Sequence, residues 1–302
     1  MPVYKYSGWS FGDVEALINV VGEENARALI AGDLVLQCNG QIVQIQEAIR
    51  ALFDKNGRRI PPKGLVANVC DADRDFHLNQ PKLDYGLRLA RFDQTGLVSF
   101  ISAADFAARA EALITQLREN ERTSNLLKGT YLPIVVPQTK VSDLGKSTEE
   151  FVTAAGDSYL RQFPDRAFNN YRKGELEKQV TIVLGSRYQQ LTKSIEKESV
   201  VGIYFPSCLQ GFSVEAQREQ MHSIPEGFIL SGPLDTAMGW MMYPDVLGRD
   251  YKTPGNDCSA VQWRSPGGSL DFGALDDCAD FGDGSLLSFA RSRYSGGLFF
   301  LG

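Results

Sequence analysis

The spacing of apolar residues predicts a chain that mixes helices with short strands. An apolar residue at every third or fourth position predicts helices over 13–21, 23–31, 44–53, 102–122, 148–163 and 214–222, and a helical or irregular stretch rich in Met and Trp over 234–243. Short branched or alternating runs predict strands at 34–36, 65–69, 97–101, 131–137, 180–184, 200–205, 228–230 and 270–274. The strand 131–137 contains Pro133 and Pro137, and proline cannot donate a backbone hydrogen bond, which predicts a position at a sheet edge. The pattern is typical of the α+β class.

A polar stretch, 138–147, is the best candidate for a domain boundary. The chain has 302 residues, of which 43% are apolar, so it can bury one large core or two smaller ones. We therefore expect a mixed helical and strand region of unassigned role over 1–137 and a second domain over 138–302.

Composition and charge exclude several classes of partner. The net charge is −6 and Lys and Arg do not cluster, so we expect no nucleic-acid partner. No apolar stretch reaches the length of a membrane span, and the first residues show no secretory signal, which makes the cytoplasm the default location. The sequence leaves the oligomeric state open.

Motifs for catalysis, metals and cofactors are absent or incomplete. Asp71, Asp73 and Asp75 have the spacing of a calcium loop, but Phe76 stands where that loop needs Gly, so we expect a solvated turn. The chain has two His and five Cys with no C-x-x-C pair, which disfavours zinc. A triad of Cys208, His222 and Asp235 has no support from spacing. We expect no catalytic residue, no metal and no cofactor.

The last segment, 265–302, combines two interleaved sets of residues. Strict alternation places Leu270, Phe272 and Ala274 in a core. That core set continues with Phe281, Leu286, Leu287, Ala290, Tyr294, Leu298 and Phe300. The remaining positions form a predicted exposed, ligand-binding face, which comprises Asp271, Gly273, Leu275, Asp277, Cys278, Asp280, Asp283, Arg291 and Arg293. Asp, Arg and Gly are residues that binding surfaces use.

The same segment lacks Lys, Glu, Gln, Met and Trp altogether, although the composition of the first 264 residues predicts about seven of them in a stretch of this length. No codon that ends in a pyrimidine encodes any of these five amino acids. Every amino acid that is present has such a codon. Either a loop region excludes long side chains, or many codons descend from a pyrimidine-ending ancestor that was randomised at its first two bases.

Six stretches of the chain carry a family resemblance, namely 170–176, 179–183, 201–206, 209–213, 225–228 and 294–302. They resemble the variable proteins of diversity-generating retroelements, as found in small-genome candidate-phyla bacteria, over roughly 130–302. In that family a reverse transcriptase rewrites the C-terminal segment with adenine-directed errors, which yields the codon set inferred above. The resemblance implies a C-type-lectin-like fold with an antiparallel sheet. It also implies a non-enzymatic protein that binds varied ligands, often proteins, without using the calcium site of the fold.

Two alternatives stay open. The first is an enzyme on the related formylglycine-generating, sulfatase-modifying variant of the lectin-like fold. It would require a reactive Cys pair or a metal in the cleft, and Cys258 and Cys278 are the pair near that region. The second is a structural or oligomeric surface component without a specific ligand.

Overall fold

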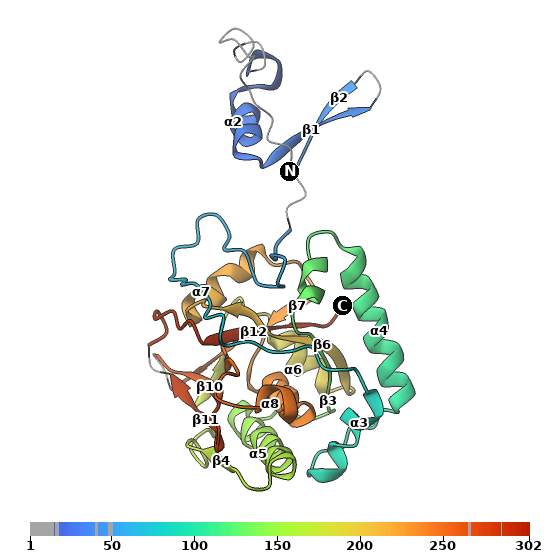
Figure 1. The fold of residues 1–302 in the computed structure, drawn as a ribbon, viewed down its shortest axis with the longest axis vertical. Coiled ribbons are helices and arrows are strands. Elements are labelled where there is room, and N and C mark those ends of the chain that lie inside the picture. The colour runs from blue at the N-terminus through green and yellow to red at the C-terminus, as the bar shows by residue number, and fades with distance from the viewer. Residues whose placement is uncertain (1–14, 16–17, 40–41, 48–50, 265–266, 285) are drawn as a thin grey trace. The chain divides into compact units, whose positions relative to one another are not determined.

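A computed structural model describes residues 15, 18–39, 42–47, 51–264, 267–284 and 286–302 (Figure 1). The chain divides into two compact units, Met1–Arg50 and Ala51–Gly302. Of the helix predicted over 13–21, residues 15 and 18–21 are described and are helical, whereas 13, 14, 16 and 17 lie outside the described residues.

Among its described residues, the first unit also contains a further helix and a hairpin. The helix, α2 (Glu23–Ala31), ends at Gly32, whose left-handed backbone (φ 71°) turns the chain into β1 (Leu34–Asn39). That strand pairs with β2 (Ile42–Glu47) in antiparallel register. The prediction of a helix over 44–53 is therefore wrong. Alternation of Val and Ile with Gln across 43–46 fits the period of a strand, and the pairing with β1 stabilises it.

The second unit is organised around one mainly antiparallel sheet of eight strands, in the order β3-β6-β12-β8-β10-β11-β4, with β7 also paired to β12. Only the β12–β8 and β11–β4 pairs are parallel. The strands are β3 (Leu132–Val136), β4 (Ala167–Asn170), β6 (Val200–Gln210), β7 (Phe228–Leu230), β8 (Gly255–Asp257), β10 (Ser269–Ala274), β11 (Cys278–Gly284) and β12 (Tyr294–Phe300). The edge position predicted for the strand at 131–137 is confirmed, because β3 lies at one end of the sheet.

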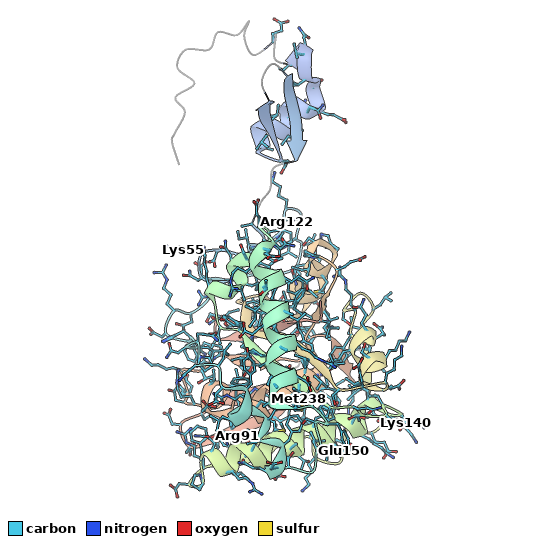
Figure 2. All side chains as sticks on the ribbon, turned by 90° about the vertical axis from the view of Figure 1, so that its right-hand side faces the viewer. Lys55, Arg91, Arg122, Lys140, Glu150 and Met238 are labelled. Atoms are coloured by element: carbon cyan, nitrogen blue, oxygen red, sulfur yellow. The ribbon has the colours of Figure 1, made fainter. Side chains whose placement is uncertain are left out.

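Helices pack against this sheet, and a two-stranded ribbon completes the unit (Figures 1 and 2). The long helix α4 contacts β6, and α8 contacts both α5 and β3. The helices are α3 (Tyr85–Leu89), α4 (Ala103–Glu119), α5 (Leu144–Gln162), α6 (Gln189–Ile195), α7 (Val214–Glu219), α8 (Pro233–Met242) and α9 (Pro244–Leu247), with 3-10 turns at Phe92–Gln94, Ser124–Lys128 and Gln220–Ser223. The ribbon pairs β5 (Val180–Ile182) with β9 (Val261–Trp263). The α+β class is confirmed.

The core of the second unit lies where α8 meets the sheet. Every residue of α8 is buried, as expected for its Met and Trp content. The ring of Trp240 stacks on Phe272 of β10 with 5.3 Å between centroids, and Phe272 contacts Phe281 of β11 at 4.8 Å. These three fully buried rings join a helix to the two strands of the hairpin β10–β11.

The division between the units lies at residue 50, whereas the sequence pattern places a boundary at 137. The reason is that β3, which precedes that boundary, pairs along its whole length with β6, which follows it. The polar stretch 138–147 instead leads into α5, and this helix begins at Leu144 because the Asp143 side chain caps it, accepting a hydrogen bond from the Lys146 amide at 2.9 Å.

Two predicted strands do not form. Residues 65–69 make only one isolated bridge, between Val69 and Phe212, and Val66 is exposed. Residues 97–101 are irregular, with Phe100 in a left-handed conformation (φ 50°) and largely exposed. Both runs are apolar enough for a strand, but neither has a neighbouring strand to pair with. Within the described part of the chain, no helix is both long and apolar enough to cross a bilayer.

Candidate ligand-binding site

The hairpin β10–β11 separates a buried face from an accessible one. Its register pairs Phe272 with Phe281 and Gly273 with Asp280. Leu270, Phe272 and Ala274 are buried, whereas Asp271 and Gly273, which alternate with them, are partly accessible. The alternation predicted for β10 is confirmed. Side chains on the accessible face are therefore carried by a backbone that the core holds in place.

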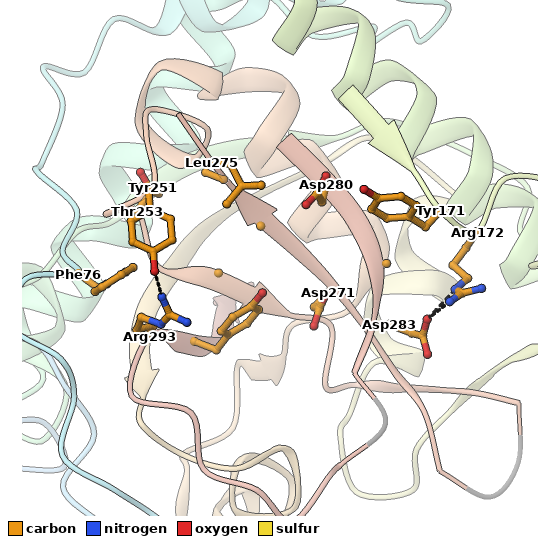
Figure 3. Close-up of a pocket in the computed structure, with 15 residues that line it drawn as sticks. Phe76, Tyr171, Arg172, Tyr251, Thr253, Asp271, Leu275, Asp280, Asp283 and Arg293 are labelled. Carbon is orange, nitrogen blue, oxygen red and sulfur yellow. Dashed lines mark hydrogen bonds and ion pairs between the residues drawn. The ribbon is translucent and has the colours of Figure 1, made fainter. Parts of the chain in front are cut away.

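A cavity of about 320 Å³ lies on this accessible face (Figure 3). Six of the nine residues predicted for the ligand-binding face line it, namely Asp271, Gly273, Leu275, Asp280, Asp283 and Arg293. The other lining residues come from the same hairpin, from β12 and from distant segments, and are Phe76, Tyr171, Arg172, Tyr251, Thr253, Gly255, Ala274, Gly282 and Tyr294. The volume suits one protruding side chain or a small ligand.

Two arginines stand on either side of this cavity, and each is already engaged (Figure 3). Arg172 donates from Nε to Asp283 Oδ1 at 2.6 Å, and its guanidinium lies 4.8 Å from the ring centroid of Trp263. Arg293 donates to the Tyr251 hydroxyl, with its guanidinium 5.2 Å from the ring centroid of Phe76. Hydrogen bonding and cation–π contact hold both guanidinium groups at the walls.

A third arginine lies behind the floor of the cavity. Arg291 forms ion pairs with Asp257, which is buried, and with Asp271 Oδ2 at 3.1 Å. Its guanidinium also lies 3.4 Å from the ring centroid of Tyr294. Burial raises the pKa of Asp271 to about 6, with Arg291 opposing the rise and Asp257 adding to it. This cluster fixes the floor rather than offering a free charge.

Asp280 is the cavity carboxylate that remains available to pair with a cation. Its Oδ1 accepts a hydrogen bond from Asn169 Nδ2 at 3.1 Å and lies 4.0 Å from Cys278 Sγ. No Lys or Arg of the described residues forms an ion pair with it. In Figure 3 the neighbouring labelled ring is Tyr171, which is 60% exposed. A carboxylate beside an exposed aromatic ring is a suitable receptor for a cationic group.

Three of the nine predicted residues do not line the cavity. Asp277 is exposed in the hairpin turn, and Cys278 is half-buried at the start of β11. Arg291 does not line the cavity itself, but it contacts two residues that do, Asp271 and Tyr294. Sequence alternation assigns these residues to the accessible side of the chain but cannot distinguish the cavity from its surroundings.

Part of the predicted core set is also misplaced. Leu286 is 71% exposed, while Leu287, Ala290 and Tyr294 are half-buried. The segment 286–293 runs along the outside of the unit, where its backbone is tied down by hydrogen bonds, such as the one from the Glu215 amide to the Leu287 carbonyl at 3.1 Å. Its leucines therefore never reach the core. The burial predicted for Phe281, Leu298 and Phe300 is confirmed.

Sequence patterns missed the aromatic wall of the cavity. Phe76 and Tyr251 contact each other edge to face at 5.4 Å, although 175 positions separate them in the chain. No local periodicity encodes such a long-range contact. Gly255 gives one usable signal, since a Cβ at this position would lie 2.4 Å from the Tyr294 ring, so only glycine lets β8 approach β12 here.

The groups considered for catalysis lack the required environment. Burial raises the pKa of Cys258 well above its ordinary value, and burial with nearby carboxylates raises the pKa of Cys278 to about 11. Both sulfurs therefore stay protonated thiols at neutral pH. His222 is exposed, whereas Cys208 and Asp235 are buried, and no hydrogen bond among the described residues joins them. In that part of the chain, no group of three or more His, Cys, Asp or Glu is placed to hold a metal ion.

Comparisons with protein-family models, with curated proteins and with solved structures find no match to this chain.

Proposed function

We propose that this protein is a non-enzymatic ligand-binding protein of the retroelement-diversified type, with a C-type-lectin-like fold in its C-terminal part. One observation carries the proposal. Six residues that alternation marks as changeable, within the segment of unusual composition, gather around a single cavity, and the buried hairpin face beneath them holds the backbone. Asp271 is held in the ion-pair cluster with Arg291, but the other five positions can change their side chains without loss of the fold, since exposed positions contribute little to stability.

The rim of the cavity favours a protein as the ligand. Tyr171 is 60% exposed and Tyr251 43%, and Leu275 adds exposed aliphatic surface between them and the hairpin turn. Exposed tyrosines beside Asp and Arg are typical of surfaces that bind proteins, because a tyrosine offers a large contact area with few rotatable bonds.

The charges of the cavity favour a cationic group on that protein. Arg172 and Arg293 are engaged at the walls, whereas Asp280 has no cationic partner among the residues that the structure describes. The hairpin turn adds two exposed carboxylates, Asp276 and Asp277. We therefore propose that a lysine or arginine side chain of the target enters the cavity and pairs with Asp280.

A peptide array tests the binding part of the proposal. Each peptide is synthesised with Lys or Arg and again with norleucine or citrulline at the same position. The wild-type protein should retain the cationic member of the pairs, and Asp280→Asn should weaken that retention about tenfold, as expected for the loss of one charged hydrogen bond. Asp93→Asn, an exposed acid outside the cavity, is the matched control. Equal retention by both variants would contradict the assignment of Asp280.

Sequencing genomic copies of the gene tests the diversification part. Substitutions should concentrate in codons for 265–302, at template adenines, with a reverse-transcriptase gene nearby. Substitutions scattered evenly over the whole gene would refute diversification while leaving the peptide-binding result untouched.

A further inference from the structure

A second and larger cavity, about 790 Å³, lies in the second unit and shares no lining residue with the first. Three segments form most of it. They are the turn 54–58, the loop 71–80 and the segment 128–130, which we call together the basic basin. The proposed function does not use this cavity.

The charge of the basin contrasts with that of the protein. Lys55, Arg58, Arg74 and Lys128 line it, against two carboxylates, although the whole chain carries −6. None of the ion pairs formed by the described residues involves any of these four cations. Four like charges in one concavity repel each other. Binding of an anion relieves this repulsion and therefore lowers the free energy.

The two carboxylates do not neutralise these cations. Asp54 Oδ1 accepts hydrogen bonds from the amides of Asn56 at 2.8 Å and Arg58 at 2.9 Å, so its role is to close the turn 54–58. The other acid, Asp71, is exposed and forms no ion pair with the basin cations. The cations therefore remain available to a ligand.

The backbone beneath the cations is fixed. Gly57 has a left-handed backbone (φ 75°), and a Cβ added to it would lie 2.6 Å from the Gly129 nitrogen. The turn that carries Lys55 and the segment that carries Lys128 are thus in direct contact. In the same turn, Arg58 donates from Nη2 to Gln210 Oε1 at 3.1 Å, and Gln210 is buried. A fixed backbone limits the loss of entropy on binding to that of the side chains.

The rest of the lining narrows the ligand chemistry. Asn56, Asn79, Thr130 and Ser207 supply neutral hydrogen-bonding groups, and the described lining includes no Phe, Tyr or Trp. A nucleobase or a sugar ring therefore finds no large aromatic ring in this described lining, only the small imidazole of His77, whereas a compact anion with several oxygens finds charged and neutral donors. We infer that the basic basin binds a compact multivalent oxyanion, of the polyphosphate or polycarboxylate kind.

Isothermal titration of the full chain with sodium triphosphate at low ionic strength tests this inference. The wild-type protein should bind, and binding should weaken as salt rises because salt screens the cations. The double variant Lys55→Gln/Lys128→Gln should weaken binding at least about tenfold, by loss of two charged contacts. Both lysines are exposed, so the fold should persist.

The matched control is Lys140→Gln/Lys193→Gln, which removes the same charge outside the basin; Figure 2 shows Lys55 and Lys140 at well-separated places. The control should bind triphosphate like the wild type. A parallel titration with citrate distinguishes the two sources of such an anion, since preference for triphosphate indicates phosphate and preference for citrate indicates carboxylate. Absence of binding to both anions, or equal losses in the two double variants, would overturn the inference.

Discussion

Truncation of Phe272 to alanine should measure how strongly the core supports the ligand-binding face. Phe272 is fully buried between the rings of Trp240 and Phe281, with centroid distances of 5.3 and 4.8 Å. Removing a phenyl ring from such a position costs about 3–5 kcal/mol. In a unit of this size 1 kcal/mol lowers the melting temperature by about 2–4 °C, so we expect a decrease of roughly 10 °C.

Differential scanning calorimetry of Phe272→Ala beside Asp277→Ala provides the comparison. Asp277 is exposed in the turn of the same hairpin, so its truncation should change the free energy of unfolding by less than about 0.5 kcal/mol. Similar decreases in both variants, or none in Phe272→Ala, would show that the hairpin is not divided into a supporting and a displaying face.

A double-mutant cycle between Phe272 and Phe281 tests the register itself. The two rings face each other across β10 and β11, and such an aromatic pair is worth about 0.5–1.5 kcal/mol beyond its buried area. The two single truncations should therefore be non-additive by about that amount. Strict additivity would mean that the rings are not in contact.

Three further substitutions address the basin, the cavity floor and the core. Gly57→Ala should destabilise the protein by at least about 1 kcal/mol more than Gly64→Ala, because both have a left-handed backbone but only Gly57 has neighbouring backbone in the way. Arg291→Met should cost about 3 kcal/mol in chemical denaturation, because it leaves Asp257 buried without its cation. Asp235 is fully buried, and burial raises its pKa to about 7, so its contribution to stability is present below about pH 4 and is lost as pH rises through 7.

The pH prediction is checked with Asp235→Asn, which keeps the oxygen that accepts a hydrogen bond from the Gly232 amide. Between pH 4 and 7 the stability of the wild type relative to this variant should fall by up to about 1.4 kcal/mol per pH unit. A difference that does not change with pH would contradict the assignment. For Arg291→Met, a destabilisation no larger than that of Asp277→Ala would show that the ion pairs do not support the floor.

Sequence patterns predict the elements that depend on interactions between residues close together in the chain, such as apolar spacing and helix caps. The helix α4 was found from its apolar spacing, and its start from Ser102, whose hydroxyl accepts a hydrogen bond from the Asp105 amide at 3.1 Å. The strand β2 was missed because Ile and Gln alternate over too few residues to exclude a helix, and only pairing with β1 decides between them.

Only the part of the candidate site that lies on one strand could be predicted, because local patterns record the alternation of a strand but not contacts between distant segments. Alternation along β10 places the side chains of Asp271 and Gly273 on the face of the strand that Phe272 does not occupy, so this part of the accessible face follows from the sequence. Phe76, Tyr171 and Tyr251 come to the cavity from distant segments, and their positions depend on tertiary contacts that no local spacing records. The prediction for Leu286 is wrong in the opposite sense. Its apolar side chain suggests burial, but its segment does not enter the core.

The register of β10 and β11 imposes a rule on how this hairpin can be altered. Successive residues point to opposite sides, so inserting or deleting one residue inside β10 or β11 would reverse the sides of the residues beyond it, which can move Phe272 or Phe281 into water and bring aspartates into the core. Replacement of side chains leaves that parity intact. A library of variants built on this hairpin must therefore keep the lengths of its strands constant and vary only the types of residue.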